Sequence, residues 1–190
     1  MLAIPGKYSS LAYVRPIEWV EIFAAWKKGE SCQKAWQQHW QQHGFESWEE
    51  WRTAYIAPLG AENLSWELFA ITDPLRDIPS FYGVPSRGWI SKAYANQATL
   101  ELRALANLSV LSQNDKITAI KKSFPGKTML TGIIHGGRIV IYEGMHRAGA
   151  IATWEKDRPL EAQISIALAE WKNPHIPIVG GNYKDGVKKS

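Results

Sequence analysis

The sequence predicts an α/β fold of the α+β kind, in which a small mixed sheet with its helices follows a tryptophan-rich helical front section. Three observations predict this fold. Pairs of tryptophans recur at helical spacing early in the chain, two β-rich runs flank Gly136 and Gly137, and an apolar strand passes into a helix at Gly144. With 45% hydrophobic and 21% charged residues, the 190-residue chain has the composition of a protein that buries a core.

The front section is expected to contain three short helices. Pro16 is a favoured first helical residue, Ser31 is a candidate N-cap, and Ser47 with Glu50 matches a capping box. A glycine or a proline follows each helical pattern and ends it. The expected helices span residues 16–28, 32–43 and 48–57.

Helical and β-rich patterns are mixed in the rest of the chain. A stretch rich in Pro and Gly separates the first strand of this part from its first helix. We expect strands over residues 66–72, 129–135, 138–143 and 163–168, helices over 93–108, 115–124 and 146–156, and a long loop over 73–89. On this basis residues 1–62 form a helical extension, 63–178 an α/β domain, and 179–190 a polar, basic tail.

Composition limits the function classes. The formal charge of +4 and the pI of about 9.1 favour anionic ligands in a general way, without selecting DNA, nucleotide or membrane. Cys32 is the single cysteine, which excludes an intramolecular disulfide and a cysteine-rich zinc site built from this chain alone. The sequence shows no secretory signal and no uncharged apolar run of about 18 residues. We therefore expect a cytoplasmic protein with no membrane partner.

Two patterns in the front section suggest other functions, and both are weak. The turn at Gly44 between two helices resembles a helix-turn-helix, but Arg52 is the only basic residue of the helix that would enter a DNA groove. Nucleic acid is therefore a less favoured partner. His39 and His43 have the spacing of a metal pair, yet no acidic residue accompanies them, and we expect ordinary surface histidines.

The segment 139–154 carries the strongest functional signal. An apolar strand ends in Glu143 and Gly144, and a helix begins immediately with His146 and Arg147. Such a junction combines unpaired backbone N–H groups with the positive end of the helix dipole, and Arg and His add side-chain donors. The sequence predicts a phosphate site here. The alternative is a simple turn, with Arg147 extended to solvent and His146 capping the helix.

The run over residues 116–154 is similar to the core of the ParB/sulfiredoxin-like superfamily. The most specific part is Gly144-Met145-His146-Arg147, which matches its Gly-x-His-Arg motif at the start of a helix. The resemblance implies a small α/β fold that binds the phosphates of ATP or CTP through this turn, including Met145 as part of it. In the sulfiredoxin branch a Lys and a hydroxyl residue on the preceding helix also contact nucleotide, and Lys116 and Ser123 occupy similar places.

Departures from the family decide the expected branch. Met145 stands where sulfiredoxins need their cysteine, which argues against sulfinic acid repair. The chain has no helix-turn-helix pattern after the motif, which argues against a partition role. Related free serine kinases place an acidic residue just before the motif glycine and use it with the His. Glu143 stands at that place, where it would act as a base with His146 or hold Mg²⁺. The alternative is an exposed glutamate at a strand end.

The sequence therefore favours a protein that binds a nucleoside triphosphate with Mg²⁺ and acts as a phosphotransferase or hydrolase on it, with an unidentified acceptor. Two alternatives stay open. One is a nucleotide-binding or protein-interaction module without turnover, and the other is a ParB-like DNA-binding or nuclease protein.

Overall fold

The computed structural model describes residues 1–181, and residues 182–190 of the expected tail lie outside the described residues. Five strands form one mixed sheet, and only β3 and β5 run parallel to each other. The sheet order is β1-β2-β5-β3-β4, with β1 at Leu11–Ile17, β2 at Trp66–Ile71, β3 at Lys127–His135, β4 at Arg138–Glu143 and β5 at Gln163–Glu170. The expected α+β fold with a mixed sheet is confirmed.

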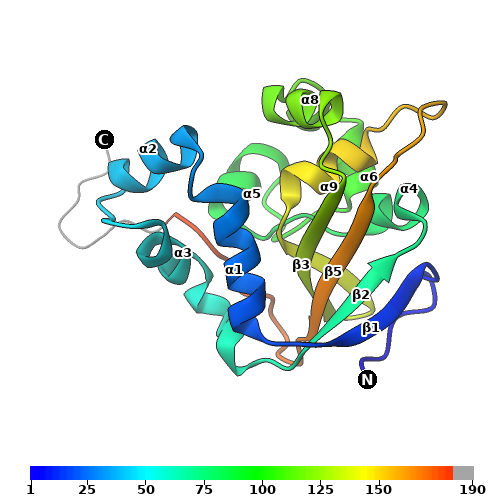
Figure 1. Ribbon diagram of the computed structural model, residues 1–190, viewed down its shortest axis with the longest axis horizontal. Coiled ribbons are helices and arrows are strands. Elements are labelled where there is room, and N and C mark those ends of the chain that lie inside the picture. The colour runs from blue at the N-terminus through cyan, green and yellow to red at the C-terminus, as the bar shows by residue number, and fades with distance from the viewer. Residues whose placement is uncertain (182–190) are drawn as a thin grey trace.

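Helices cover the sheet in two groups that Figure 1 separates. The front section supplies α1 (Trp19–Glu30), α2 (Lys34–Gln42) and α3 (Trp48–Ile56), followed by the 3-10 turns η1 (Ala57–Leu59) and η2 (Ala61–Asn63). The rest of the chain supplies α4 (Pro74–Asp77), the 3-10 turn η3 (Ile78–Ser80), α5 (Arg87–Ala93), α6 (Leu102–Ala106), α7 (Ser109–Ser112), α8 (Asp115–Lys122) and α9 (Met145–Ala152). Among residues 1–181, none of these helices has the length and apolar character needed to cross a membrane.

The predicted first helix was wrong at its start, because residues 11–17 form the edge strand β1. Pro16 lies opposite Glu67 in this strand instead of opening a helix. An edge strand tolerates proline because one row of its N–H groups needs no partner in the sheet. The helix starts only at Trp19, where Glu18 and Glu21 form a reciprocal capping box.

The other two helices of the front section lie close to their expected places. Helix α2 begins at Lys34, two residues later than expected, with Gln33 and not Ser31 as its N-cap. Helix α3 begins as expected, and the hydroxyl of Ser47 accepts a hydrogen bond from the backbone N–H of Glu50. The cap at Ser47 was thus predictable from sequence, whereas the cap at Ser31 was not formed.

The single helix predicted over residues 93–108 was wrong, because within this range only the end of α5 and the short helix α6 at Leu102–Ala106 are helical before Leu108. Helix α5 ends at Ala93, and the chain then passes through Ala95 and Asn96, which have φ angles of 46° and 68°. Left-handed residues stop a helix, and the alanine-rich composition does not overcome that turn. The expected loop over 73–89 contains α4, η3 and the start of α5.

The front section packs as part of the protein core and is not a loose extension. Side chains of Trp26, Trp48 and Trp66 are buried, and the rings of Trp19 and Trp66 stack at 5.6 Å. The indole N–H of Trp26 donates a hydrogen bond of 2.9 Å to the hydroxyl of Thr131 in β3. This bond joins α1 directly to β3, an inner strand of the sheet.

The C-terminal segment also packs against both groups of helices. The backbone N–H of Val179 donates to the carbonyl of Pro85, and Arg87 donates back to Val179. Gly180 is buried and its N–H reaches the carbonyl of Tyr55 in α3. The start of the expected polar tail is therefore part of the packed structure.

Candidate functional site

The junction between β4 and α9 forms as the sequence predicts. Strand β4 ends at Glu143, and Gly144 is the N-cap of α9 with φ 91° and ψ 17°. A Cβ atom at this position would overlap with Cδ2 of Leu130. Both the left-handed backbone and the lack of space therefore require glycine.

Replacing this glycine should destabilise the fold. We expect Gly144→Ala to lower the free energy of unfolding by about 2–4 kcal/mol, since left-handed strain and overpacking against Leu130 add together. Urea denaturation followed by circular dichroism measures this change. Gly88→Ala is the matched control, because Gly88 lies in a helix with open space around its Cα. Equal stability of the two variants would contradict the tight turn.

The first turn of α9 presents backbone donors. The N–H of Ala148 donates to the carbonyl of Gly144, which closes the first helical turn. The preceding N–H groups, from Met145 to Arg147, have no carbonyl available within the helix, and Gly144 has no side chain to cap them. They lie at the positive end of the helix dipole, where an anion is stabilised.

Arg147 turns inward, towards the sheet. Its Nη1 donates a 2.7 Å hydrogen bond to Oγ1 of Thr128 in β3, and its Nη2 forms an ion pair with Oε1 of Glu143. The side chain of Glu143 is only 7% exposed and that of Arg147 is 25% exposed. The alternatives of a solvent-facing glutamate and a solvent-extended arginine are both wrong. An anion at this helix would have to share Arg147 with Glu143.

Glu143 has one oxygen without a partner. Among the described residues, no group forms a hydrogen bond with its buried Oε2. Burial raises the pKa of Glu143, and the neighbouring charge of Arg147 opposes that rise. A buried carboxylate oxygen without a donor is costly, and a ligand hydroxyl or a cation would satisfy it.

His146 stands beside an aromatic ring at the same end of α9. Its ring centroid lies 5.8 Å from that of Trp89 in α5. Burial, followed by the charges of Lys116 and Arg147, lowers the pKa of His146 to about 4. The imidazole is therefore neutral at pH 7, with one nitrogen free to donate and the other free to accept.

This shift predicts a pH dependence of stability. An unfolded chain protonates His146 near pH 6.5, whereas the folded chain does so only near pH 4. Between these values the unfolded state binds more protons, so the free energy of unfolding falls as the pH decreases from 6.5 to 4. We expect His146 to contribute about 2 kcal/mol to that fall.

Denaturation curves between pH 4 and 7 test this expectation, with wild type and His146→Gln measured in parallel. The variant should lose part of the slope because Gln does not titrate. His175→Gln, at an exposed position, is the control and should keep the slope of wild type. An unchanged slope in His146→Gln would show that the imidazole is not shielded.

The structure brings Lys116 to the site but not Ser123. Helix α8 packs along α9, and a Cβ at Gly149 would contact Ile117. Lys116 lies in the first turn of α8, while Ser123 is its C-cap at the opposite end. Ser123 there lines a surface hollow with Trp154, beyond the far end of α9. The spacing of Lys116 and Ser123 predicted that both lie on one face of the same helix, but α8 ends at Lys122.

Met145 would present its backbone N–H, and not its side chain, to a ligand at the start of α9. Its side chain is buried, and its methyl group would lie 3.1 Å from a Cβ at Gly83. The hydroxyl of Tyr94 would also meet that Cβ, and it has no hydrogen-bond partner among the described residues. Met145 therefore fixes the helix start against the loop before α5.

Sequence reasoning missed a buried ion pair close to the junction. Arg52 of α3 donates to Glu30 of α1, with 2.7 Å between Nε and Oε2, and the indole of Trp48 donates to the same oxygen at 3.0 Å. The charge of Arg52 stabilises ionised Glu143, so the two pairs are electrostatic neighbours. No local pattern revealed this, because Glu30 and Arg52 lie on different helices.

The burial of Arg52 also argues against α3 as a DNA-recognition helix. Arg52 is buried with Trp48, Trp51 and Ile56 on the inner face of α3. The only basic residue of that helix is thus engaged inside the protein.

Cationic groups from both groups of helices gather around the start of α9. The charge of Lys116 lowers the pKa of His146 and also that of His39 in α2, which falls to about 4 chiefly through burial. Arg52 contributes to the lowering at His39 as well. His39, interpreted from sequence as a surface histidine, is half-buried beside Trp51.

The donor set does not form a metal site of its own. No group of three or more His, Cys, Asp or Glu side chains that could hold a metal ion occurs in residues 1–181. Glu143 offers a single unpartnered oxygen, Oε2, and its other oxygen is paired with Arg147. A Mg²⁺ ion here would need most of its ligands from phosphates and water.

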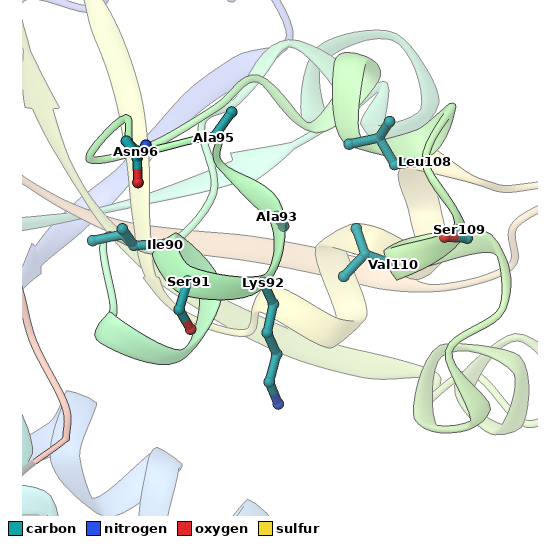
Figure 2. A pocket seen from close by; sticks show the side chains of 9 residues that line it. All are labelled: Ile90, Ser91, Lys92, Ala93, Ala95, Asn96, Leu108, Ser109 and Val110. Atoms are coloured by element: carbon teal, nitrogen blue, oxygen red, sulfur yellow. The ribbon is translucent and has the colours of Figure 1, made fainter.

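A second surface hollow lies between α5 and α7, and Figure 2 shows the side chains around it. Lys92 is its one charged lining residue, beside Asn96 and the apolar Leu108 and Val110. Ser91 and Ser109 add hydroxyl groups to its lining.

Comparisons of the chain with protein-family models, with curated proteins and with solved structures found no match.

Proposed function

We propose that this protein binds a nucleoside triphosphate, ATP or CTP, with its terminal phosphates at the start of α9, as the resemblance to the ParB/sulfiredoxin-like superfamily implies. One observation carries the proposal. The turn from Glu143 through Gly144 to Arg147 combines free helix N–H groups, a guanidinium and an unpartnered carboxylate oxygen in one place.

Phosphate binding would use donors that are already in position. The N–H groups from Met145 to Arg147 point out of the first turn, and Arg147 stays anchored to Thr128 through Nη1. Its Nη2 would then move from Glu143 to a phosphate oxygen, which exchanges one charge-assisted hydrogen bond for another. Lys116, exposed at the start of α8, adds a flexible cation.

Mg²⁺ would reach the site together with the phosphates. Once Arg147 turns to the phosphates, the carboxylate of Glu143 becomes a candidate hydrogen-bond acceptor for a water molecule of this ion. The cation supplies charge neutralisation of the phosphates when bound.

The turnover that we propose is transfer of the terminal phosphoryl group to a hydroxyl of an acceptor or of water. The acceptor oxygen forms the new P–O bond, the bond to the nucleoside diphosphate breaks, and the hydroxyl proton passes to Glu143. The raised pKa of Glu143 suits proton acceptance at this step. Neutral His146 can donate a hydrogen bond to the transferred group.

Isothermal titration with ATP, CTP and GTP in the presence of Mg²⁺ tests binding. We expect Arg147→Ala to weaken nucleotide binding by about 1.5–3 kcal/mol through loss of a charged hydrogen bond. Arg103→Ala, at an exposed position of α6, is the matched control and should bind as wild type does. Absence of binding by wild type, or equal binding by Arg147→Ala, would refute the proposal.

Release of inorganic phosphate, or its transfer to added acceptors, tests turnover separately. We expect Glu143→Gln to keep nucleotide binding and lose turnover. Binding by wild type with no turnover above background would instead identify a nucleotide-binding module.

A further inference from the structure

Trp36 of α2 lies next to a cation that belongs to another part of the chain. The Nζ atom of Lys116 is 4.7 Å from the centroid of the Trp36 ring. The ring is half-buried, 5.3 Å from the ring of Trp51, with the guanidinium of Arg52 over it at 5.6 Å. The indole thus contacts side chains of both α3 and α8.

Lys116 links this ring to the candidate phosphate site. It is exposed and lies in the first turn of α8, alongside the start of α9. Its ammonium group contacts Trp36 of α2, and its charge lowers the pKa of His39 in α2 and of His146 in α9. An aromatic face, an exposed cation and a helix N-terminus therefore lie near one another.

The buried carboxylate of Glu143, just before the start of α9, independently indicates a ligand. The side chain of Glu143 is only 7% exposed, and its Oε2 has no partner among the described residues. A ligand that brings a hydroxyl, a metal ion or bound water would satisfy that oxygen.

An aromatic ring beside a phosphate site is suited to a nucleobase. Stacking on an aromatic side chain does not depend on which base is present, because each base has a π-face. The contact between Lys116 and the indole is weak at an exposed position, so a base can displace the ammonium group at small cost.

We propose that Trp36 is the residue that contacts the nucleobase, with Lys116 moving from its ring to the phosphates. This inference rests on the proposed nucleotide site. It assigns α2 of the front section to ligand recognition and predicts that a nucleotide binds more tightly than a bare polyphosphate.

Binding of ATP and of inorganic tripolyphosphate to the full chain separates the base from the phosphates. Trp36→Leu should weaken ATP binding by about 5- to 100-fold, as expected for a lost stacking contact, and leave tripolyphosphate binding within about twofold of wild type. Trp154→Leu is the matched control, because Trp154 also carries a cation, Arg158 at 4.5 Å, but lies at the far end of α9. It should bind both ligands as wild type does.

The outcomes distinguish this inference from the proposed function. Loss of both ligands to the same extent in Trp36→Leu would mean that Trp36 only supports the fold, and it would overturn the inference. No binding of either ligand by wild type would overturn the proposed function itself. Tighter binding of a short single-stranded oligonucleotide than of ATP would favour a nucleic-acid strand and also overturn the inference.

Photolabelling of the unaltered chain decides the question if Trp36→Leu does not fold. The probe is 8-azido-ATP, whose reactive group sits on the base. We expect label in the tryptic peptide 35–52, which contains Trp36, and loss of that label with excess ATP. Label that ATP removes only from other peptides would contradict a base on Trp36.

Discussion

Arg52→Ala is expected to lower the free energy of unfolding by about 3–5 kcal/mol, because it leaves Glu30 buried with its charge uncompensated. The two side chains are 7% and 10% exposed, and Glu30 accepts hydrogen bonds from Nε and Nη2 of Arg52. The substitution also removes the guanidinium from the face of Trp51, where it lies at 4.5 Å. Urea denaturation measures the loss.

A double substitution separates charge from packing. Arg52→Met combined with Glu30→Gln removes both charges, and it should be clearly more stable than Arg52→Ala. Arg15→Ala is the exposed control: its pair with Glu21 is about half exposed, and we expect no measurable change in stability. If Arg52→Ala were as stable as Arg15→Ala, the ion pair would not hold α1 and α3 together.

Arg147→Ala is expected to lower the free energy of unfolding by about 2–3 kcal/mol at pH 8, since Glu143 loses its counter-charge in a buried position. The loss should shrink at low pH. Without Arg147 the pKa of Glu143 lies further above its ordinary value of 4.5, so the folded state binds a proton that the unfolded state has released. The free energy of unfolding of Arg147→Ala therefore falls as the pH rises from 4.5 towards the raised pKa of Glu143.

Adding Glu143→Gln to Arg147→Ala should restore part of the stability and remove its new pH dependence, because the buried charge is gone. Denaturation curves at pH 5 and pH 8 measure both effects. The double variant also matters for function, since it lacks the guanidinium and is expected to be more stable than Arg147→Ala. Equal pH dependence in the single and double variants would show that Glu143 is not the group that titrates.

Local signals predicted the parts of the structure that depend on neighbouring residues. Gly136 and Gly137 have φ angles of 55° and 72° and form the hairpin turn between β3 and β4, as expected. Ser47 caps α3 by accepting a hydrogen bond from the N–H group of Glu50, also as expected. The turn at Gly144 followed the same logic, because its constraint lies in its own backbone.

Features that depend on distant residues were not predictable. Pro16 suits a helix start and an edge strand equally, and only pairing with β2 decides between them. The ion pair of Glu30 with Arg52 joins two helices, and no spacing in the sequence indicates it. The inward direction of Arg147 depends on Thr128, which is 19 residues earlier in the chain.

The central claim is that the first turn of α9 binds phosphate, and the backbone amide signals of Met145, His146 and Arg147 test it most directly. Nuclear magnetic resonance spectra of ¹⁵N-labelled protein would be recorded during titration with ATP and Mg²⁺. We expect these three signals to shift most and to saturate together, since their N–H groups would donate to the phosphates. Saturating shifts confined to the hollow between α5 and α7, with these three signals unmoved, would contradict the account.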